Sequence, residues 1–94
     1  MDLTFEWDAR KARANLKKHG ISFEEARTVF NDPLALTFPD VDHSNGEQRY
    51  LSIGLSSQGR VLVVVHMERS ENIRLISCRR ATPKERAAYE QGDF

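Results

Sequence analysis

Apolar and polar residues alternate along three long stretches of the chain, which is the periodicity of half-buried β-strands. The stretches are Arg49–Ser56, Arg60–Arg69 and Ile73–Arg80. Ser57-Gln58-Gly59 separates the first two and predicts a hairpin, with glycine where a positive φ angle is wanted. Two shorter stretches, Leu3–Trp7 and Leu34–Phe38, are typical of further strands.

Start and stop signals predict three helices. Asp8 is placed to cap the first helix, and Gly20 to end it in the left-handed conformation. Ser22-Phe23-Glu24-Glu25 has the capping-box pattern and begins a second helix, which Asn31-Asp32-Pro33 stops. Thr82-Pro83-Lys84-Glu85 repeats the pattern, with proline at the first helical position, and begins a short C-terminal helix.

The predicted order is therefore β-α-α-β-β-β-β-α, and we expect residues 1–94 to form a single domain. Strands joined by hairpins after two helices predict an α+β fold with an antiparallel sheet. The two N-terminal helices should pack on one face of that sheet.

Because alternate residues of a strand face opposite ways, the pattern also assigns side chains to faces. We expect the helices to cover the face of Leu51, Ile53, Val63 and Val65, with Leu75 beside them. The opposite face, with Tyr50, His66 and Arg80, would then be partly polar and open.

In the predicted pairing Tyr50 lies opposite His66, and Ile76 flanks His66 on the other side. A one-residue slip in this second hairpin would exchange the faces of Arg79 and Arg80.

Composition places the chain among folded globular proteins, with 39% hydrophobic and 30% charged residues. No apolar run is long enough to span a bilayer, and the first residues lack a signal-peptide layout, so a cytoplasmic protein is expected. Cys78 is the one cysteine, and with three histidines it matches no zinc spacing. We expect no metal or cofactor.

The zero net charge hides a segregation of charge along the chain. Five basic residues lie between Arg10 and Lys18, and a second basic set runs from Arg60 to Arg86, with acids gathered between them. Segregation of this kind indicates a basic face for a polyanion. For residues 10–18 alone, a solvated helix face explains the pattern equally well.

The second basic set contains residue types that could cleave RNA without a metal. Cleavage by the adjacent 2′-hydroxyl needs a proton acceptor, a cation for the phosphorane and a proton donor. A histidine near pKa 6.5, here His66, can serve as acid or base, and the guanidinium groups of Arg79 and Arg80 suit phosphate. Glu47, Glu68 or Tyr89 could be the second proton-transfer group.

Five further residues are candidates for RNA binding: Arg49, Tyr50, Arg69, Lys84 and Arg86. Several structural readings compete with these roles. His66 could be a packing residue, Arg79-Arg80 could pair with Glu85, and Glu47 with Arg49 could be a surface ion pair. The tyrosines could be edge aromatics rather than stacking platforms for unpaired bases.

Ordered motifs run across almost the whole chain: Phe5-Glu6-Trp7-Asp8, Asn15–Ala26, Gly46–Tyr50, Val65–Arg69 and Ile73–Thr82, and Lys84-Glu85-Arg86 with Tyr89-Glu90. Together they resemble the BrnT family of toxins. Cys78 occupies a position where the family pattern leads us to expect a small residue.

This resemblance implies a RelE-like ribonuclease fold, RNA cleavage that arrests translation, and neutralisation by a cognate BrnA antitoxin. DNA would be bound only through the toxin–antitoxin complex, at its own operator. The positions matching the family's polar strand residues are Glu47, Arg49, His66, Arg69, Arg79 and Arg80. Two alternatives stay open, a non-catalytic nucleic-acid-binding module and a protein-interaction domain on the same scaffold.

Overall fold

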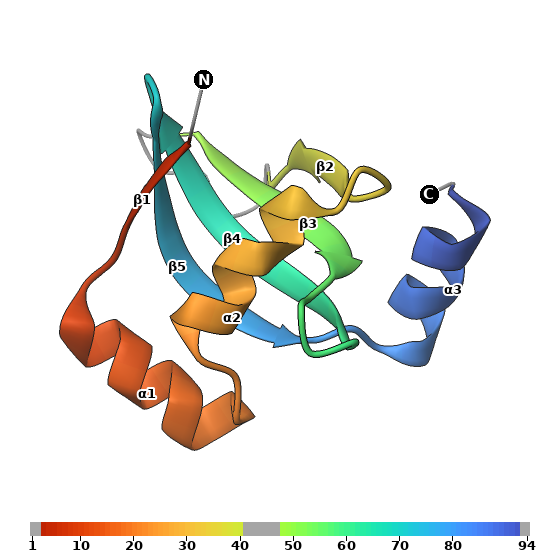
Figure 1. Ribbon diagram of the computed structural model, residues 1–94, viewed down its shortest axis with the longest axis horizontal. Helices are drawn as coiled ribbons and strands as arrows, with labels where there is room; N and C mark the ends of the chain where they lie inside the picture. The colour runs from red at the N-terminus through yellow and green to blue at the C-terminus, as the bar shows by residue number, and fades with distance from the viewer. Residues whose placement is uncertain (1–2, 41–47, 93–94) are drawn as a thin grey trace.

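The computed structural model describes residues 3–40 and 48–92 and contains a five-stranded sheet in the order β1-β5-β4-β3-β2 (Figure 1). The strands are β1 (Thr4–Glu6), β2 (Leu36–Pro39), β3 (Arg49–Leu55), β4 (Val61–Arg69) and β5 (Asn72–Arg80). The helices are α1 (Ala9–His19), α2 (Phe23–Arg27), the 3₁₀ turn η1 (Thr28–Asn31) and α3 (Pro83–Gln91). The predicted element order and the α+β class are confirmed.

The predicted caps form as expected, with one exception. The Asp8 carboxylate accepts from the N–H groups of Arg10 and Lys11, and Gly20 ends α1 with φ of 72°. Thr82 and Glu85 complete a full capping box at α3. At α2 only half of the capping box forms, namely the hydrogen bond from the Glu25 N–H to the Ser22 hydroxyl. The Glu25 side chain instead turns to Arg60 and Ser56 across the sheet end.

The helices cover the opposite face of the sheet from the one predicted. The main core cluster joins Ile21, Phe23 and Val29 of the helical layer to Leu62 and Val64 of β4. These strand residues share a face with Gly54, His66, Leu75 and Cys78, and we call this the covered face. The face with Leu51, Ile53, Val63, Val65 and Met67 is the second face. Both faces of β4 are apolar, so alternation alone could not choose between them.

Gly54 explains why the helical layer packs on this face. A Cβ atom built at Gly54 would lie 2.9 Å from Ala35 Cβ and 2.9 Å from Val29 Cγ1. Such distances are within van der Waals repulsion, so only glycine lets the segment after α2 lie this close to β3. The glycine therefore places the helices on its own face.

A β-bulge shifts the pairing of β4 with β5 between Val65 and His66. Tyr50 lies opposite His66, as predicted, but His66 pairs with Leu75 on its other side, so the prediction of Ile76 there was wrong. The extra residue returns Ile73 and Leu75 to the covered face, where both are buried. Position 75 was predicted to lie under the helices and does so only because of this bulge.

On the outer edge of β5, away from β4, a side chain takes the place of a neighbouring strand along half of the strand's length. β1 is parallel to β5 and pairs only with Asn72–Arg74. Beyond it, the buried Asn15 of α1 donates to the Cys78 carbonyl at 2.9 Å and accepts from the Cys78 N–H at 2.9 Å. Asn15 also donates to the Ile21 carbonyl at 3.0 Å. One amide thus ties α1, the start of α2 and the edge of β5 together.

We predict that Asn15→Ala destabilises the fold by about 3 kcal/mol, because three buried backbone groups lose their partner. Urea unfolding followed by circular dichroism measures the loss. Asn31→Ala, at an exposed asparagine, is the control and should change stability by less than about 0.5 kcal/mol. Equal stability of Asn15→Ala and the unmodified protein would contradict this role.

Candidate functional site

His66 lies inside the protein, not on an open polar face. Its ring is 0% exposed, on the covered face. The ring meets Phe30 edge-on, with centroids 4.9 Å apart, and stacks on the half-buried Tyr50 at 5.8 Å. Its Nε2 is 2.8 Å from Ser52 Oγ, which is 2.7 Å from Thr37 Oγ1. Among residues 3–40 and 48–92, Nδ1 has no hydrogen-bond partner.

Burial lowers the pKa of His66 from 6.5 to about 4. The ring is therefore neutral at pH 7, and the expectation of an unperturbed pKa was wrong. RNA cannot touch a ring that is covered by Phe30 and Tyr50. The geometry fits a group that orients Tyr50 and Ser52; of this set Tyr50 is half-buried and Thr37 is exposed.

Arg79 and Arg80 point to opposite sides of the sheet. Arg79 pairs across from Val63 on the second face, and Arg80 across from Leu62 on the covered face, near the sheet end. Both Arg79 terminal nitrogens bind Glu85, at 2.7 and 2.9 Å, and this pair lowers the pKa of Glu85 to about 2. Arg80 is exposed. The two guanidinium groups therefore do not form one fork on a single face.

The predicted residues gather at two ends of the sheet. Arg49, Tyr50, His66 and Arg69 lie at the end where β3 begins and β4 finishes. Arg79, Arg80, Lys84, Arg86 and Tyr89 lie at the other end, where β5 runs into α3.

Along β4, the position opposite Arg80 is four residues from His66, roughly 13 Å at strand spacing. The expected cluster of Tyr50, His66 and Arg80 therefore does not exist. On the covered face, the β4 residues that follow His66 in the direction of Arg80 are Val64 and Leu62, and both are buried.

Tyr89 is bound to an aspartate that the sequence pattern did not single out as functional. Its hydroxyl donates to Asp32 Oδ2 at 2.5 Å, which raises the pKa of Tyr89 to about 12. Burial favours the neutral form of Asp32, yet hydrogen bonds from the Leu55 N–H, Tyr89 and the Leu34 N–H hold its pKa below the usual value. The Tyr89 proton is thus already engaged, which weakens its case as a catalytic acid.

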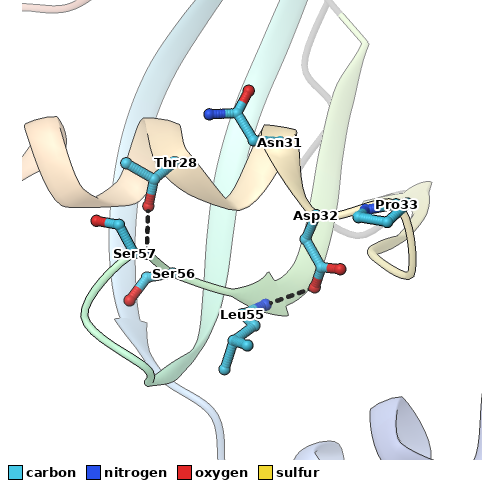
Figure 2. Close-up of a pocket in the computed structure, with 7 residues that line it drawn as sticks. All are labelled: Thr28, Asn31, Asp32, Pro33, Leu55, Ser56 and Ser57. Carbon is cyan, nitrogen blue, oxygen red and sulfur yellow. Dashed lines mark hydrogen bonds between the residues drawn. The ribbon is translucent and has the colours of Figure 1, made fainter.

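Figure 2 shows the cavity beside this aspartate, about 340 Å³ in volume and lined by Thr28, Asn31, Asp32, Pro33, Leu55, Ser56 and Ser57. Thr28 Oγ1 accepts from the Ser57 N–H and Asp32 from the Leu55 N–H, both at 2.8 Å. Its polar groups serve to attach η1 to the β3–β4 hairpin. An ionised Asp32 makes the cavity a poor place for phosphate.

The other predicted residues have less defined places. Lys84 and Arg86 are exposed on α3, and Arg86 Nε is 3.7 Å from Glu90. Glu68 is exposed near the end of β4. Glu47 lies outside the described residues. Within residues 3–40 and 48–92, no three His, Cys, Asp or Glu side chains are grouped to hold a metal ion.

Residues 7–85 match the family model described as "Ribonuclease toxin, BrnT, of type II toxin-antitoxin system". The chain belongs to the BrnT toxin family. Among solved structures, the 1.1 Å crystal structure of the Brucella abortus ribonuclease toxin BrnT matches with a TM-score of 0.67 and 25% identity, over 86% of this chain and 99% of that one. No curated protein sequence shows a significant match.

Family membership confirms the resemblance to BrnT toxins that the sequence motifs indicated. It implies an RNA target and a protein antitoxin. No helix in the described ranges is long and apolar enough to cross a membrane.

We predict that burial of neutral His66 makes the fold sensitive to mild acid. The folded-state pKa of about 4 is below the unfolded value of 6.5, so the unfolded chain binds the proton first. Stability is complete above pH 6.5 and falls as the pH drops towards 4, by on the order of 3 kcal/mol if the full shift is realised. Urea unfolding at several pH values between 7 and 4 measures the loss.

His66→Gln keeps a hydrogen-bonding side chain beside Ser52 but does not titrate, so its stability should be nearly flat between pH 6.5 and 5. Glu25, Asp32 and Glu85, whose pKa values are lowered, contribute only at lower pH. His19→Gln is the matched control and should retain the acid sensitivity. The same slope in His66→Gln and the unmodified protein would assign the effect to other groups.

Proposed function

We propose that this BrnT family member is an endoribonuclease that needs no metal ion and binds the scissile region of RNA where β5 meets α3. The proposal rests on one observation. Arg79, Arg80, Lys84 and Arg86 place four cations within eight residues at this junction. Arg79 is fixed by Glu85, while Arg80, Lys84 and Arg86 are exposed.

Arg79 is the best candidate to contact the reacting phosphate. It emerges on the second face, and its side chain keeps 42% of its surface exposed despite the pair with Glu85. A guanidinium that already binds a carboxylate through two nitrogens has the geometry to bind two phosphate oxygens. Phosphate would take the place of Glu85 in this contact.

The chemistry would be attack of the ribose 2′-hydroxyl on the adjacent phosphorus. The 2′-oxygen bond forms as the bond to the 5′-oxygen breaks, giving a 2′,3′-cyclic phosphate and a free 5′-hydroxyl. A base removes the 2′ proton, and an acid protonates the leaving oxygen. Fixed cations stabilise the charge that builds on the phosphorane, often the largest single contribution to catalysis.

The geometry changes the assignment of the proton-transfer groups most. His66 is too deeply buried to contact substrate, and we assign it the positioning of Tyr50, which could stack on an unpaired base. Glu47 stays a candidate proton-transfer group. Arg49 and Arg69 are proposed to bind RNA at the far end of the sheet, where Tyr50 lies.

Family membership supports a proposal for the cellular role. We propose that the chain acts in the cytoplasm as a single domain, that RNA cleavage inhibits translation, and that a BrnA-like antitoxin neutralises it. Binding of DNA would occur only through the toxin–antitoxin complex at its operator.

The main prediction is that the purified protein cleaves single-stranded RNA in excess EDTA and leaves 2′,3′-cyclic phosphate ends. Arg79→Gln should reduce kcat/KM by about 100-fold, because a cation at the phosphorane is lost. Gel analysis of labelled RNA with end-group mapping measures both. Intact RNA in EDTA would contradict the metal-free mechanism, and binding without cleavage under any condition would favour a non-catalytic module.

Arg74→Gln is the matched control, since Arg74 lies on the same strand and face but at the opposite end, paired with Glu6 at 3.3 Å. It should change kcat/KM by less than about threefold. An equal loss in Arg74→Gln and Arg79→Gln would show that the effect is one of overall charge.

A second prediction concerns Glu85, the carboxylate that phosphate must displace. Glu85→Gln should tighten binding of 2′-O-methyl RNA severalfold, because the competing charge is removed, while glutamine still suits this position of a capping box. Fluorescence anisotropy measures the affinity, and thermal unfolding checks the fold. Weaker binding would mean that Glu85 holds Arg79 ready for RNA and does not compete with it.

A further inference from the structure

A cavity of about 250 Å³ lies between α1 and β5. It is lined by Lys11, Ala14, Asn15, Lys18, His19, Ile76 and Ser77. We call it the α1–β5 groove. In Figure 1 α1 lies at the opposite side of the molecule from α3, and none of the cations at the junction of β5 and α3 lines the groove.

The groove owes its positive charge to the composition of α1. α1 holds five lysines and arginines and no acidic residue. Lys11 and Lys18 are seven residues apart, so they lie on the same side of the helix two turns apart. Among the described residues neither of them is in an ion pair, and both are exposed.

The spacing of these two lysines suits a nucleic-acid backbone. Seven residues of α-helix span about 10.5 Å, and a stacked strand rises about 3.4 Å per nucleotide, so the lysines match phosphates about three nucleotides apart. The small and apolar side chains of Ala14 and Ile76 leave room for ribose between the cations. Strongly hydrated lysines suit phosphate contacts that carry no sequence information.

The groove lies close to the proposed site along β5. Ser77 lines the groove and lies on the second face, two residues before Arg79 on the same strand. Two residues of strand are about 7 Å, roughly the reach of two nucleotides. RNA held at Arg79 can therefore continue along β5 into the groove.

We propose that the α1–β5 groove binds the phosphodiester backbone of single-stranded RNA, several nucleotides from the cleaved bond. The inference rests on the proposed ribonuclease function, but concerns substrate length rather than chemistry. Lys11 and Lys18 contribute affinity for long RNA and none for a dinucleotide, which is too short to reach from Arg79.

The test compares two double variants with equal loss of charge. Lys11→Gln with Lys18→Gln removes the groove cations. Arg13→Gln with Lys17→Gln is the control, because neither residue lines the groove; Arg13 lines a separate cavity with Glu24 on the other flank of α1. All four positions are exposed, so both variants should fold, which circular dichroism verifies.

Binding of a 20-nucleotide 2′-O-methyl RNA, which cannot be cleaved, is measured by anisotropy over a range of salt concentrations. Losing two phosphate contacts should lower the slope of log affinity against log salt by about 1.4 and weaken binding about 10-fold at 0.1 M salt. The slope of the control variant should differ from that of the unmodified protein by less than about 0.5. Equal slopes in the two doubles, or an unchanged slope in the groove double, would overturn the proposal.

Cleavage assays separate this inference from the proposed function. The groove double should lose about 10-fold in kcat/KM on a 20-nucleotide RNA, with no change on a dinucleotide. A similar loss on both substrates would overturn the proposal. Unchanged RNA binding with weakened antitoxin neutralisation would also overturn it, by showing that the groove takes a protein. If the unmodified protein cleaves no RNA, the proposed function fails, while the anisotropy result still decides the groove.

Discussion

The close approach of the helical layer to Gly54 determines most of what this structure presents to solvent. β4 is apolar on both faces, with Leu62 and Val64 on one and Val63 and Val65 on the other, so hydrophobic burial alone does not choose a side. The missing side chain at Gly54 admits Val29 and Ala35 to within contact distance of β3. With η1 packed against this face, Phe30 covers the His66 ring, and Arg79 lies on the second face.

The sequence predicted the elements well because their signals are local. Asp8, Gly20, Ser22, Thr82 and Pro83 act on the backbone within one helical turn, and the structure places helix ends at all of them. The pairing of Tyr50 with His66 follows from the length of the hairpin loop. Order and class of the fold needed no long-range information.

The choice of face and the site depended on contacts that alternation does not encode. A glycine in a strand is typical of close backbone approach, and Gly54 was the signal that could have reversed the assignment. The bulge at Val65 and His66 left no local trace. The roles of Asp32 and Ser52 depend on partners far along the chain, Tyr89 for one and His66 for the other. The pKa of His66 could not be predicted while it was taken to be open to water.

Asn15 has a consequence for how the molecule can assemble with others. An unpaired strand edge is a template for strand addition by another chain, and many proteins protect such edges. Here an amide side chain occupies both backbone groups of Cys78 on the half of β5 that β1 leaves unpaired. An incoming strand would have to displace α1 and break the link to Ile21. Edge-to-edge association through this part of β5 is therefore blocked in the folded state, and any partner that recognises this side of the molecule must do so through side chains.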